Sequence, residues 1–428
     1  MEVHRMNRTA LDGFAAALLA VESFTDGHAV LHGPGGCRNY NSFTSSQCFP
    51  RKERRDNERF YGKYFFGNRR LPCTYVDEYD YINGTKEKLM DSIPIICDSF
   101  PGEFCVFVQS PGVALIGDNI TDCIAKAGYS NRAAAVNESL ISQPFAPSYD
   151  HTVLTVLKWM HPARRKARKG TVNILGLPIT ANDWSVALEE FRGHLESMGL
   201  EVISAPGAGC SSEELRASVE AEFNVVIQRE YCRHTADYYR DEYGIECIEC
   251  DQGAPVGFDA LESWIDRIAE ATGADPEKPR EKIMDAKRRA FRILSSTVYL
   301  KSPKYRRFSV VSESSVALPL TRWLFSYLFM MPAAAVCTKG SDQEYRGRLS
   351  GFLEGIDCPD AMDRDPDGAE TSYLFADGQY AALAEATGLC DKGIDIGLPS
   401  LLRVNFLSRP IFGIHGAMYL LDEIFRRA

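Results

Sequence analysis

The stretch VNILGLPITANDWSVALEEFRGHLESMGLEVISAPG (172–207) decides the fold. Its first residues, VNILGLP (172–178), are rich in β-forming side chains and end in Gly and Pro. WSVALEEFRGHLESMGL (184–200) has the apolar spacing of an amphipathic helix, and EVISAPG (201–207) is again β-rich. Strands that alternate with helices of this length predict a parallel sheet covered by helices on both faces.

The alternation continues beyond this stretch. Ser211, with Glu214 three residues later, has the pattern of a capping box, which marks the start of a helix within SSEELRASVEAE (211–222). Three further elements are expected: a strand NVVIQ (224–228), a helix over 230–242 and a strand GIECIE (244–249).

Similar alternations precede and follow this segment. The earlier one contains ALDGFAAALLAVESF (10–24), HAVL (28–31), TKEKLMDSI (85–93) and FCVFVQS (104–110). The later one contains FSVVSE (308–313), VALPLTRWLFSYLFM (316–330), AAAVCT (333–338), SYLFADG (372–378) and QYAALAEATG (379–388).

The sequence therefore predicts an α/β protein of three doubly wound domains with parallel sheets, at 1–165, 166–300 and 301–428. The basic run PARRKARKG (162–170) separates the first two domains. It is interpreted either as a solvated linker or as a contact face for an acidic partner. The polar run KSPKYRR (301–307) marks the second boundary.

Composition restricts the class of protein. The 428 residues are 45% hydrophobic and 25% charged, which is ordinary for a globular protein. A net charge of −10 repels phosphate backbones and argues against nucleic-acid binding. Because the sequence has no apolar run long enough for a membrane span and no signal-peptide pattern in MEVHRMNRTALDGF (1–14), we expect no membrane partner and a cytoplasmic location.

The chain has 13 cysteines, an odd number that cannot pair completely within one chain. Without a secretion signal, a disulfide framework is the weaker interpretation. Cys105 and Cys123 lie in apolar or helical surroundings and are expected to be core thiols.

The clearest local signal for chemistry is HGPGGC (32–37), which follows a predicted strand. Ligands bind at the carboxyl edge of parallel sheets, and Gly33, Gly35 and Gly36 would leave bare backbone N–H groups beside the Cys37 thiol there. The motif fits neither the P-loop nor the GxGxxG pattern. Taken alone, Cys37 is either an ordinary turn cysteine or a metal ligand.

Two more cysteines, Cys48 and Cys73, follow in polar sequence. Their spacing excludes a CxxC-type zinc knuckle or ferredoxin loop. Thiols so far apart in sequence can share a site only if the fold or a subunit interface brings them together.

Three motifs carry a family resemblance: HGPGGC (32–37), CTYVDEYDYINGTKEKL (73–89) and VQSPGVALIGDNI (108–120). In this order they resemble the catalytic component, component 1, of nitrogenase and its relatives. VNILGLP (172–178), EYGIECIECDQGAPVGFDALESWIDRIAE (242–270) and PSLLRVNFLSRPIFGIHGAMYLLDEI (399–424) resemble the rest of that family's chain.

The resemblance implies three Rossmann-like domains and a dimer or α₂β₂ assembly with an identical or paralogous component 1 subunit. It implies an iron–sulfur cluster, [4Fe–4S] or larger, at the subunit interface, and a separate ATP-dependent iron–sulfur reductase that binds the ATP and delivers electrons. Carried over to this chain, it makes Cys37 a cluster ligand, with Gly33, Gly35 and Gly36 donating backbone hydrogen bonds to the cluster.

The chain departs from the family pattern at other ligand positions. Thr9 and Pro111 stand where the family has its first and third cluster cysteines. Cys73, with Cys48 in reserve, is the expected substitute. Gln228 falls near the position of the cofactor cysteine of molybdenum nitrogenase, and no cofactor histidine is recognisable, which argues against dinitrogen reduction.

Other polar residues have a structural and a functional interpretation. Asp118 and Asn119 either cap a helix or contact a substrate or the reductase. The acidic residues of the second motif are either a solvated face or turn, or a surface that positions the reductase: Asp77, Glu78 and Asp80. The following residues are ordinary structural residues or, less expectedly, metal or redox groups: Cys232, His234, Cys247, Cys250 and His415.

Two functions are consistent with these features. The first is a nitrogenase-like oxidoreductase subunit that passes electrons through the cluster to a small molecule. The group that it reduces would be a tetrapyrrole double bond, a carbon–sulfur bond or another unsaturated group. The alternative is a non-catalytic scaffold for the assembly of a metal cofactor, which the loss of two usual ligands also suits.

Overall fold

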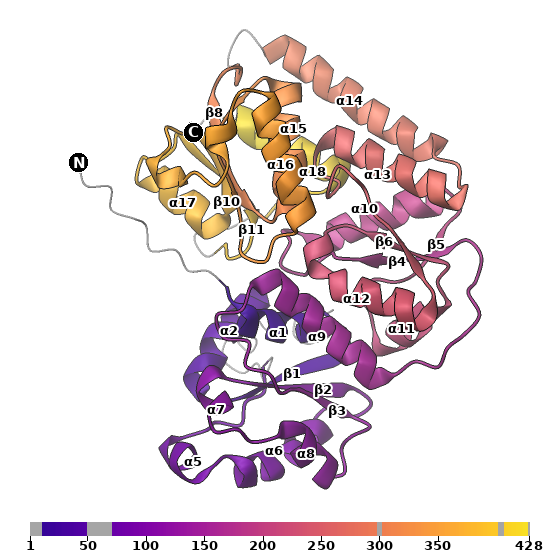
Figure 1. The fold of residues 1–428 in the computed structure, drawn as a ribbon, viewed down its shortest axis with the longest axis vertical. Helices are drawn as coiled ribbons and strands as arrows, with labels where there is room; N and C mark the ends of the chain where they lie inside the picture. Colours follow the sequence, from indigo (N-terminus) through magenta and orange to yellow (C-terminus); the bar gives the residue numbers. More distant parts are fainter. Residues whose placement is uncertain (1–10, 49–70, 298–301, 401–405, 427–428) are drawn as a thin grey trace.

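The computed structural model describes residues 11–48, 71–297, 302–400 and 406–426, so Thr9 lies outside the described residues. Figure 1 shows three lobes, each built on one sheet. The sheets have three, four and four strands, and all the strand pairs in them are parallel. The predicted α/β class with parallel, Rossmann-like sheets is confirmed.

The first lobe holds the strands in the order β1-β2-β3: β1 (Gly27–His32), β2 (Phe104–Gln109) and β3 (Ala133–Val136). Every residue of β1 and β2 is buried, as their continuous apolar runs predict for a sheet covered on both faces. The helices of this lobe are α1 (Gly13–Glu22), α2 (Gly35–Gln47), α5 (Glu78–Asn83), α6 (Lys86–Asp98), α7 (Pro111–Ala114), α8 (Ile120–Lys126) and α9 (Phe145–Met160).

Helix α1 is buried along all ten of its residues and packs lengthwise against α9. Its sequence, GFAAALLAVE, is apolar almost all round, which is typical of a helix enclosed by other elements. The Asp12 side chain caps it by accepting a hydrogen bond from the Ala15 amide at 3.2 Å.

The second lobe has the strand order β5-β4-β6-β7: β4 (Thr171–Leu175), β5 (Glu201–Ser204), β6 (Phe223–Val226) and β7 (Glu246–Ile248). The predicted capping box is present, since Ser211 and Glu214 bond each other's backbone amides. The helices are α10 (Trp184–Ser197), α11 (Ser212–Ala217), α12 (Arg233–Tyr238), α13 (Gly257–Thr272) and α14 (Glu277–Thr297).

The third lobe has the strand order β11-β10-β8-β9: β8 (Arg307–Ser312), β9 (Met331–Cys337), β10 (Tyr373–Asp377) and β11 (Lys392–Gly397). Its helices are α15 (Ser314–Leu328), α16 (Gln343–Gly355) and α17 (Gly378–Ala386). The last helix, α18 (Gly413–Phe425), returns to the second lobe and packs against α10, α13 and α14. The chain therefore ties its second and third lobes together twice, and the predicted boundaries at 165 and 300 stay predictions.

None of the described helices combines the length and the apolar composition that crossing a membrane requires.

Candidate functional site

The motif HGPGGC joins the end of β1 to the start of α2. His32 is the last residue of the strand, Pro34 is the N-cap, and the helix begins at Gly35. Cys37 therefore lies in the first turn of a helix of 13 residues, not in a bare turn as the motif alone indicates. Cys37 thus lies at the positive end of the helix dipole.

Cys73 is brought to the same turn by backbone pairing. The Leu31 amide donates to the Pro72 carbonyl at 2.8 Å, and the Thr74 amide donates to the Leu31 carbonyl at 3.1 Å. The Cys73 thiol lies 3.1 Å from the Gly33 carbonyl oxygen, to which it donates a hydrogen bond. Residues 72–74 thus extend the first sheet beside β1, and Cys73 sits under the glycine turn.

The surroundings of the Cys73 thiol shift its pKa in opposing directions. Burial raises the pKa of the Cys73 thiol, and the Tyr75 amide and the Arg38 guanidinium oppose this increase. The nearby Cys37 thiol adds to the increase. The hydrogen bond to Gly33 and the position of Cys37 in the first turn of α2 place both residues at this turn, although they are 36 residues apart in the sequence.

Cys48 lies elsewhere. It is the C-cap of α2, and the helix places it about 16 Å from Cys37 along the helix axis. The Cys48 side chain is buried, with Sγ 3.6 Å from the Thr44 carbonyl oxygen. Its own carbonyl accepts a hydrogen bond from the Trp184 indole at 2.7 Å. Cys48 therefore packs toward the second lobe, and the structure does not bring it to Cys37 and Cys73.

The donor set at the turn fits half of a four-thiolate cluster site. Within the described ranges, no three His, Cys, Asp or Glu side chains lie close enough to hold a metal ion. One more polar atom is oriented toward the turn: the Ser110 hydroxyl is buried and has no hydrogen-bond partner among the described residues. It directly precedes Pro111, which is the first residue of α7. A [4Fe–4S] cluster takes four cysteine ligands, so the two thiols at this turn would hold only half of one.

The three glycines of the motif have different roles. A Cβ atom on Gly33 would lie 2.5 Å from the Ser110 hydroxyl oxygen and 2.7 Å from the Ser110 Cβ atom. A Cβ atom on Gly35 would lie 3.2 Å from the Tyr75 ring, whereas a Cβ atom on Gly36 would meet nothing within 4 Å. Close packing therefore requires glycine at position 33 and tolerates a methyl group at position 36.

This difference gives a matched pair of variants. We expect Gly33→Ala to lower the free energy of unfolding by about 2 kcal/mol, because the added methyl group must displace Ser110 and Leu31. Gly36→Ala is expected to be neutral or to stabilise α2 by up to about 1 kcal/mol, because Ala is the better helix former. Urea unfolding of the two variants beside the wild type measures both effects, and equal destabilisation by the two would contradict this packing.

His32, which the motif contains but the sequence left without a role, lies in a buried hydrogen-bonded chain. Its Nδ1 atom is 2.9 Å from the Thr74 hydroxyl, and its Nε2 atom is 3.0 Å from the Thr85 hydroxyl. Burial lowers the pKa of His32 to about 4, against the opposing influence of the Asp118 and Asp80 carboxylates. The ring is therefore neutral at physiological pH.

Asp118 and Asn119 divide the capping roles that the sequence gave to both. The Asn119 side chain caps α8 by accepting from the Asp122 amide at 3.1 Å. Asp118 instead accepts from the Thr85 amide at 2.9 Å and from the Thr85 hydroxyl at 2.7 Å. Its carboxylate thus accepts hydrogen bonds at the N-terminus of α6. Through the Thr85 hydroxyl it is also linked to the His32 ring.

The acidic residues of the second motif form the start of α5. Asp77 and Asp80 make a capping box, and Lys88 bonds the Asp77 carboxylate at 3.1 Å. Asp77 and Glu78 are exposed, as a solvated face requires. Asp80 is buried and also forms an ion pair with Lys88, so the solvated interpretation is wrong for this residue.

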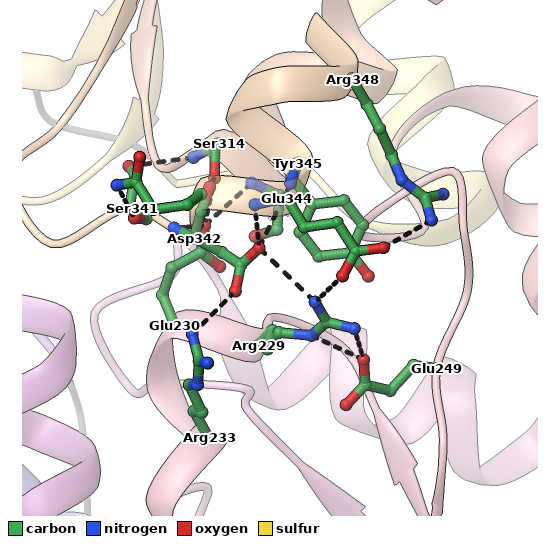
Figure 2. A network of polar contacts seen from close by, with 12 residues as sticks. Arg229, Glu230, Arg233, Glu249, Ser314, Ser341, Asp342, Glu344, Tyr345 and Arg348 are labelled. Carbon is green, nitrogen blue, oxygen red and sulfur yellow. Dashed lines mark hydrogen bonds and ion pairs between the residues drawn. The ribbon is translucent and has the colours of Figure 1, made fainter.

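The neighbourhood of Gln228 holds a polar network that joins the second and third lobes (Figure 2). Arg229, just after β6, donates to the Glu249 carboxylate at 2.6 Å and to the Glu344 carboxylate at 2.7 Å. The buried Glu230 accepts from the Ser314 hydroxyl and the Ser315 amide, each at 2.9 Å. The sequence gave no signal for this network, because its partners lie in different lobes.

The remaining candidates are held by ordinary structural contacts. The buried Cys232 has Sγ 3.4 Å from the Gln228 carbonyl, and the His234 amide donates to Asp150 at 2.6 Å. His415 bonds the Glu190 carboxylate, which also accepts from the Ile414 amide at 2.5 Å and so caps α18.

Cys247 and Cys250 do not form a matched pair on one strand. Cys247 lies in β7, and Cys250 follows the end of that strand. Burial raises the pKa of the Cys247 thiol to about 12 and also raises that of Cys250. A redox pair needs an accessible thiolate of lowered pKa, which neither residue provides.

Three sheets of parallel strands and a cysteine-bearing turn at the edge of the first sheet characterise this chain, and comparison with known proteins identifies its family. The family model described as "Nitrogenase component 1 type Oxidoreductase" matches residues 13–428, so the chain belongs to this family, as its motifs predicted. The solved structure "Nitrogenase Cp1 at pH 6.5" superposes with a TM-score of 0.74 at 13% identity, over 99% of this chain and 94% of the other.

Curated relatives match shorter parts of the chain at higher sequence identity. A light-independent protochlorophyllide reductase chain of Heliobacterium modesticaldum is 23% identical over 62% of this chain and 48% of its own length. The nitrogenase iron-iron protein alpha chain of Rhodobacter capsulatus is 24% identical over 56% of this chain and 43% of its own length. The chain thus spans about half the length of these relatives.

Proposed function

We propose that this chain is the cluster-holding subunit of a nitrogenase-like oxidoreductase. It receives electrons from an ATP-dependent iron–sulfur reductase, which binds the ATP, and passes them to a small molecule or tetrapyrrole. Membership of a family of oxidoreductases supports the reaction class. The single observation that carries the proposal is the convergence of Cys37 and Cys73 at the carboxyl edge of the first sheet.

The two thiols would hold half of an iron–sulfur cluster, which supplies one-electron transfer when bound. Cys73 must first lose the proton that it now donates to the Gly33 carbonyl, because thiolates are the ligands. The Tyr75 amide, 3.4 Å from the Cys73 sulfur, is then the hydrogen-bond donor that remains to the thiolate. Loading is therefore expected to be favoured as pH rises.

An exposed apolar surface supports the completion of the cluster by a second subunit. Ile82 in α5 and Leu115 after α7 have exposed fractions of 84% and 89%, and the rings of Tyr75 and Tyr79 are also exposed. Helices α5 and α7 lie in the same lobe (Figure 1), and a Cβ atom on Gly112 of α7 would lie 3.0 Å from the Tyr81 hydroxyl of α5. Large apolar side chains gathered on a surface mark an interface. An identical or a paralogous chain would supply the remaining ligands there.

The test is the iron content of cysteine variants purified without oxygen. We expect Cys37→Ala and Cys73→Ser each to lose most of the cluster iron and the cluster's EPR signal, while the apoproteins stay folded. Cys358→Ser is the matched control, because Cys358 is a half-buried thiol in the third lobe. Unchanged iron in Cys37→Ala would overturn the proposal, and loss with Cys48→Ser but not Cys73→Ser would reverse the order of the ligands.

A further measurement separates the oxidoreductase from the scaffold alternative. Cluster-loaded protein mixed with the reductase and ATP should reduce an unsaturated small-molecule substrate over many turnovers. Transfer of the metal to another protein without turnover would favour the scaffold.

A further inference from the structure

Four hydrogen bonds connect a loop at the surface of the first lobe to the thiol-bearing turn. They run from Asp118 through Thr85, His32 and Thr74 to the Gly33 amide, with distances of 2.7, 3.0, 2.9 and 3.2 Å. His32, Thr74 and Thr85 are buried, and the partners of His32 lie 42 and 53 residues away in the sequence. This series of hydrogen bonds therefore joins four separate segments of the first lobe.

The chemistry of the two ends fixes the direction of every bond. A carboxylate only accepts, so the Thr85 hydroxyl donates to Asp118, and the Thr85 oxygen is left to accept from His32 Nε2–H. The Gly33 amide only donates, so the Thr74 oxygen accepts it. Because the neutral ring carries its proton on Nε2, Nδ1 is unprotonated and accepts from the Thr74 hydroxyl. One tautomer, with the proton on Nε2, satisfies all four bonds.

We propose that His32 is a positioning residue for the two thiols, and that its neutral Nε2–H ring holds the Gly33 turn and the Cys73 segment in register against Thr85 and Asp118. The inference rests on the proposed function, because the role of the thiols is part of it. Thr74 is the neighbour of Cys73, and Gly33 carries the carbonyl that the Cys73 thiol bonds. A displaced ring would thus move one thiol relative to the other.

Thr85→Val is the sharpest variant, because it replaces the hydroxyl by a methyl group of similar size. The Thr85 amide can still donate to Asp118, so this hydrogen bond at the N-terminus of α6 is kept. We expect cluster release to a chelator to be at least about fivefold faster, and the midpoint potential of the cluster to shift, because hydrogen bonds near the sulfurs set that potential. Thr85→Ser keeps the hydroxyl and should match the wild type.

Two controls separate positioning from general destabilisation. Ile93→Val removes one buried methylene group from the same helix but none of the four hydrogen bonds. It should leave the midpoint potential of the cluster unchanged. The tautomer of His32 is measured independently by ¹⁵N NMR of the wild-type apoprotein, where a neutral ring protonated on Nε2 is expected.

The outcomes are distinct. A ring that is protonated on Nδ1, or a Thr85→Val cluster with the release rate and potential of the wild type, would overturn the inference. A wild-type protein that binds no cluster would overturn the proposed function instead. The tautomer measurement would still show whether His32 donates from Nε2 and accepts at Nδ1. If Thr85→Val does not fold, the tautomer remains the deciding readout.

Discussion

Lowering the pH from 6.5 to about 4 is expected to reduce the free energy of unfolding by about 3 kcal/mol through His32 alone. Above pH 6.5 the ring is neutral in both the folded and the unfolded chain and contributes no pH dependence. Between pH 6.5 and about 4 the unfolded chain binds a proton that the buried ring does not accept, so stability falls as the pH falls. Below about 4 both states are protonated and the loss is complete.

Because carboxylates also titrate in acid, the measurement is a difference between variants. Urea unfolding of the apoprotein at several pH values should show a steeper acid loss for the wild type than for His32→Gln, whose side chain does not titrate. Parallel curves for the wild type and His32→Gln would show that burial does not lower the pKa of His32.

Much of the fold could be predicted because its signals are local. Continuous apolar runs such as 104–110 become fully buried strands, and the capping box at Ser211 depends on residues three apart. Helix α14 was missed because it is mostly polar and exposed, and Ile283 and Ala290 are its few fully buried apolar side chains. Ala286 and Leu294 also pack against the core, so the apolar stripe recurs about once per turn, but charged side chains occupy most of the helix and dominate its sequence.

Strand β11 was missed for a different reason. Its sequence, KGIDIG, contains two charged residues and two glycines, which are uncommon in strands. Lys392 and Asp395 are nevertheless buried, because Glu423 pairs with the lysine at 3.4 Å and the Asn182 amide donates to the aspartate at 2.8 Å. These partners lie far away in the sequence, so the pattern within the strand gave no indication of its burial.

In the candidate site, too, local sequence identified some residues, and long-range contacts that the sequence does not show determined the others. The residue types in HGPGGC identified Cys37, and polar surroundings identified Cys73, with Cys48 in reserve. The pairing of Leu31 with Cys73 distinguishes the two, and it depends on how a segment returns to the sheet edge. His32 had no interpretable signal, since both of its partners are threonines in other segments.

The second large effect concerns the network between the second and third lobes. We expect Arg229→Ala to lower the free energy of unfolding by about 2 kcal/mol, because the partly buried Glu249 carboxylate loses its ion-pair partner, whereas Glu344 keeps Arg348. The guanidinium bonds Glu249 and Glu344, lies 3.5 Å from the Asp342 carboxylate, and covers the Tyr345 ring at 5.0 Å. Urea unfolding followed by circular dichroism measures the loss.

Two further arginine variants decide how the network acts. Arg229→Lys keeps the charge but loses the planar fork that reaches two carboxylates at once, so an intermediate loss is expected. Arg240→Ala removes exposed ion pairs with Asp237 and Asp241 in the same lobe and should cost less than about 1 kcal/mol. If Arg229→Ala costs no more than Arg240→Ala, the network does not join the lobes. A large loss would mean that the network contributes to holding the second and third lobes together.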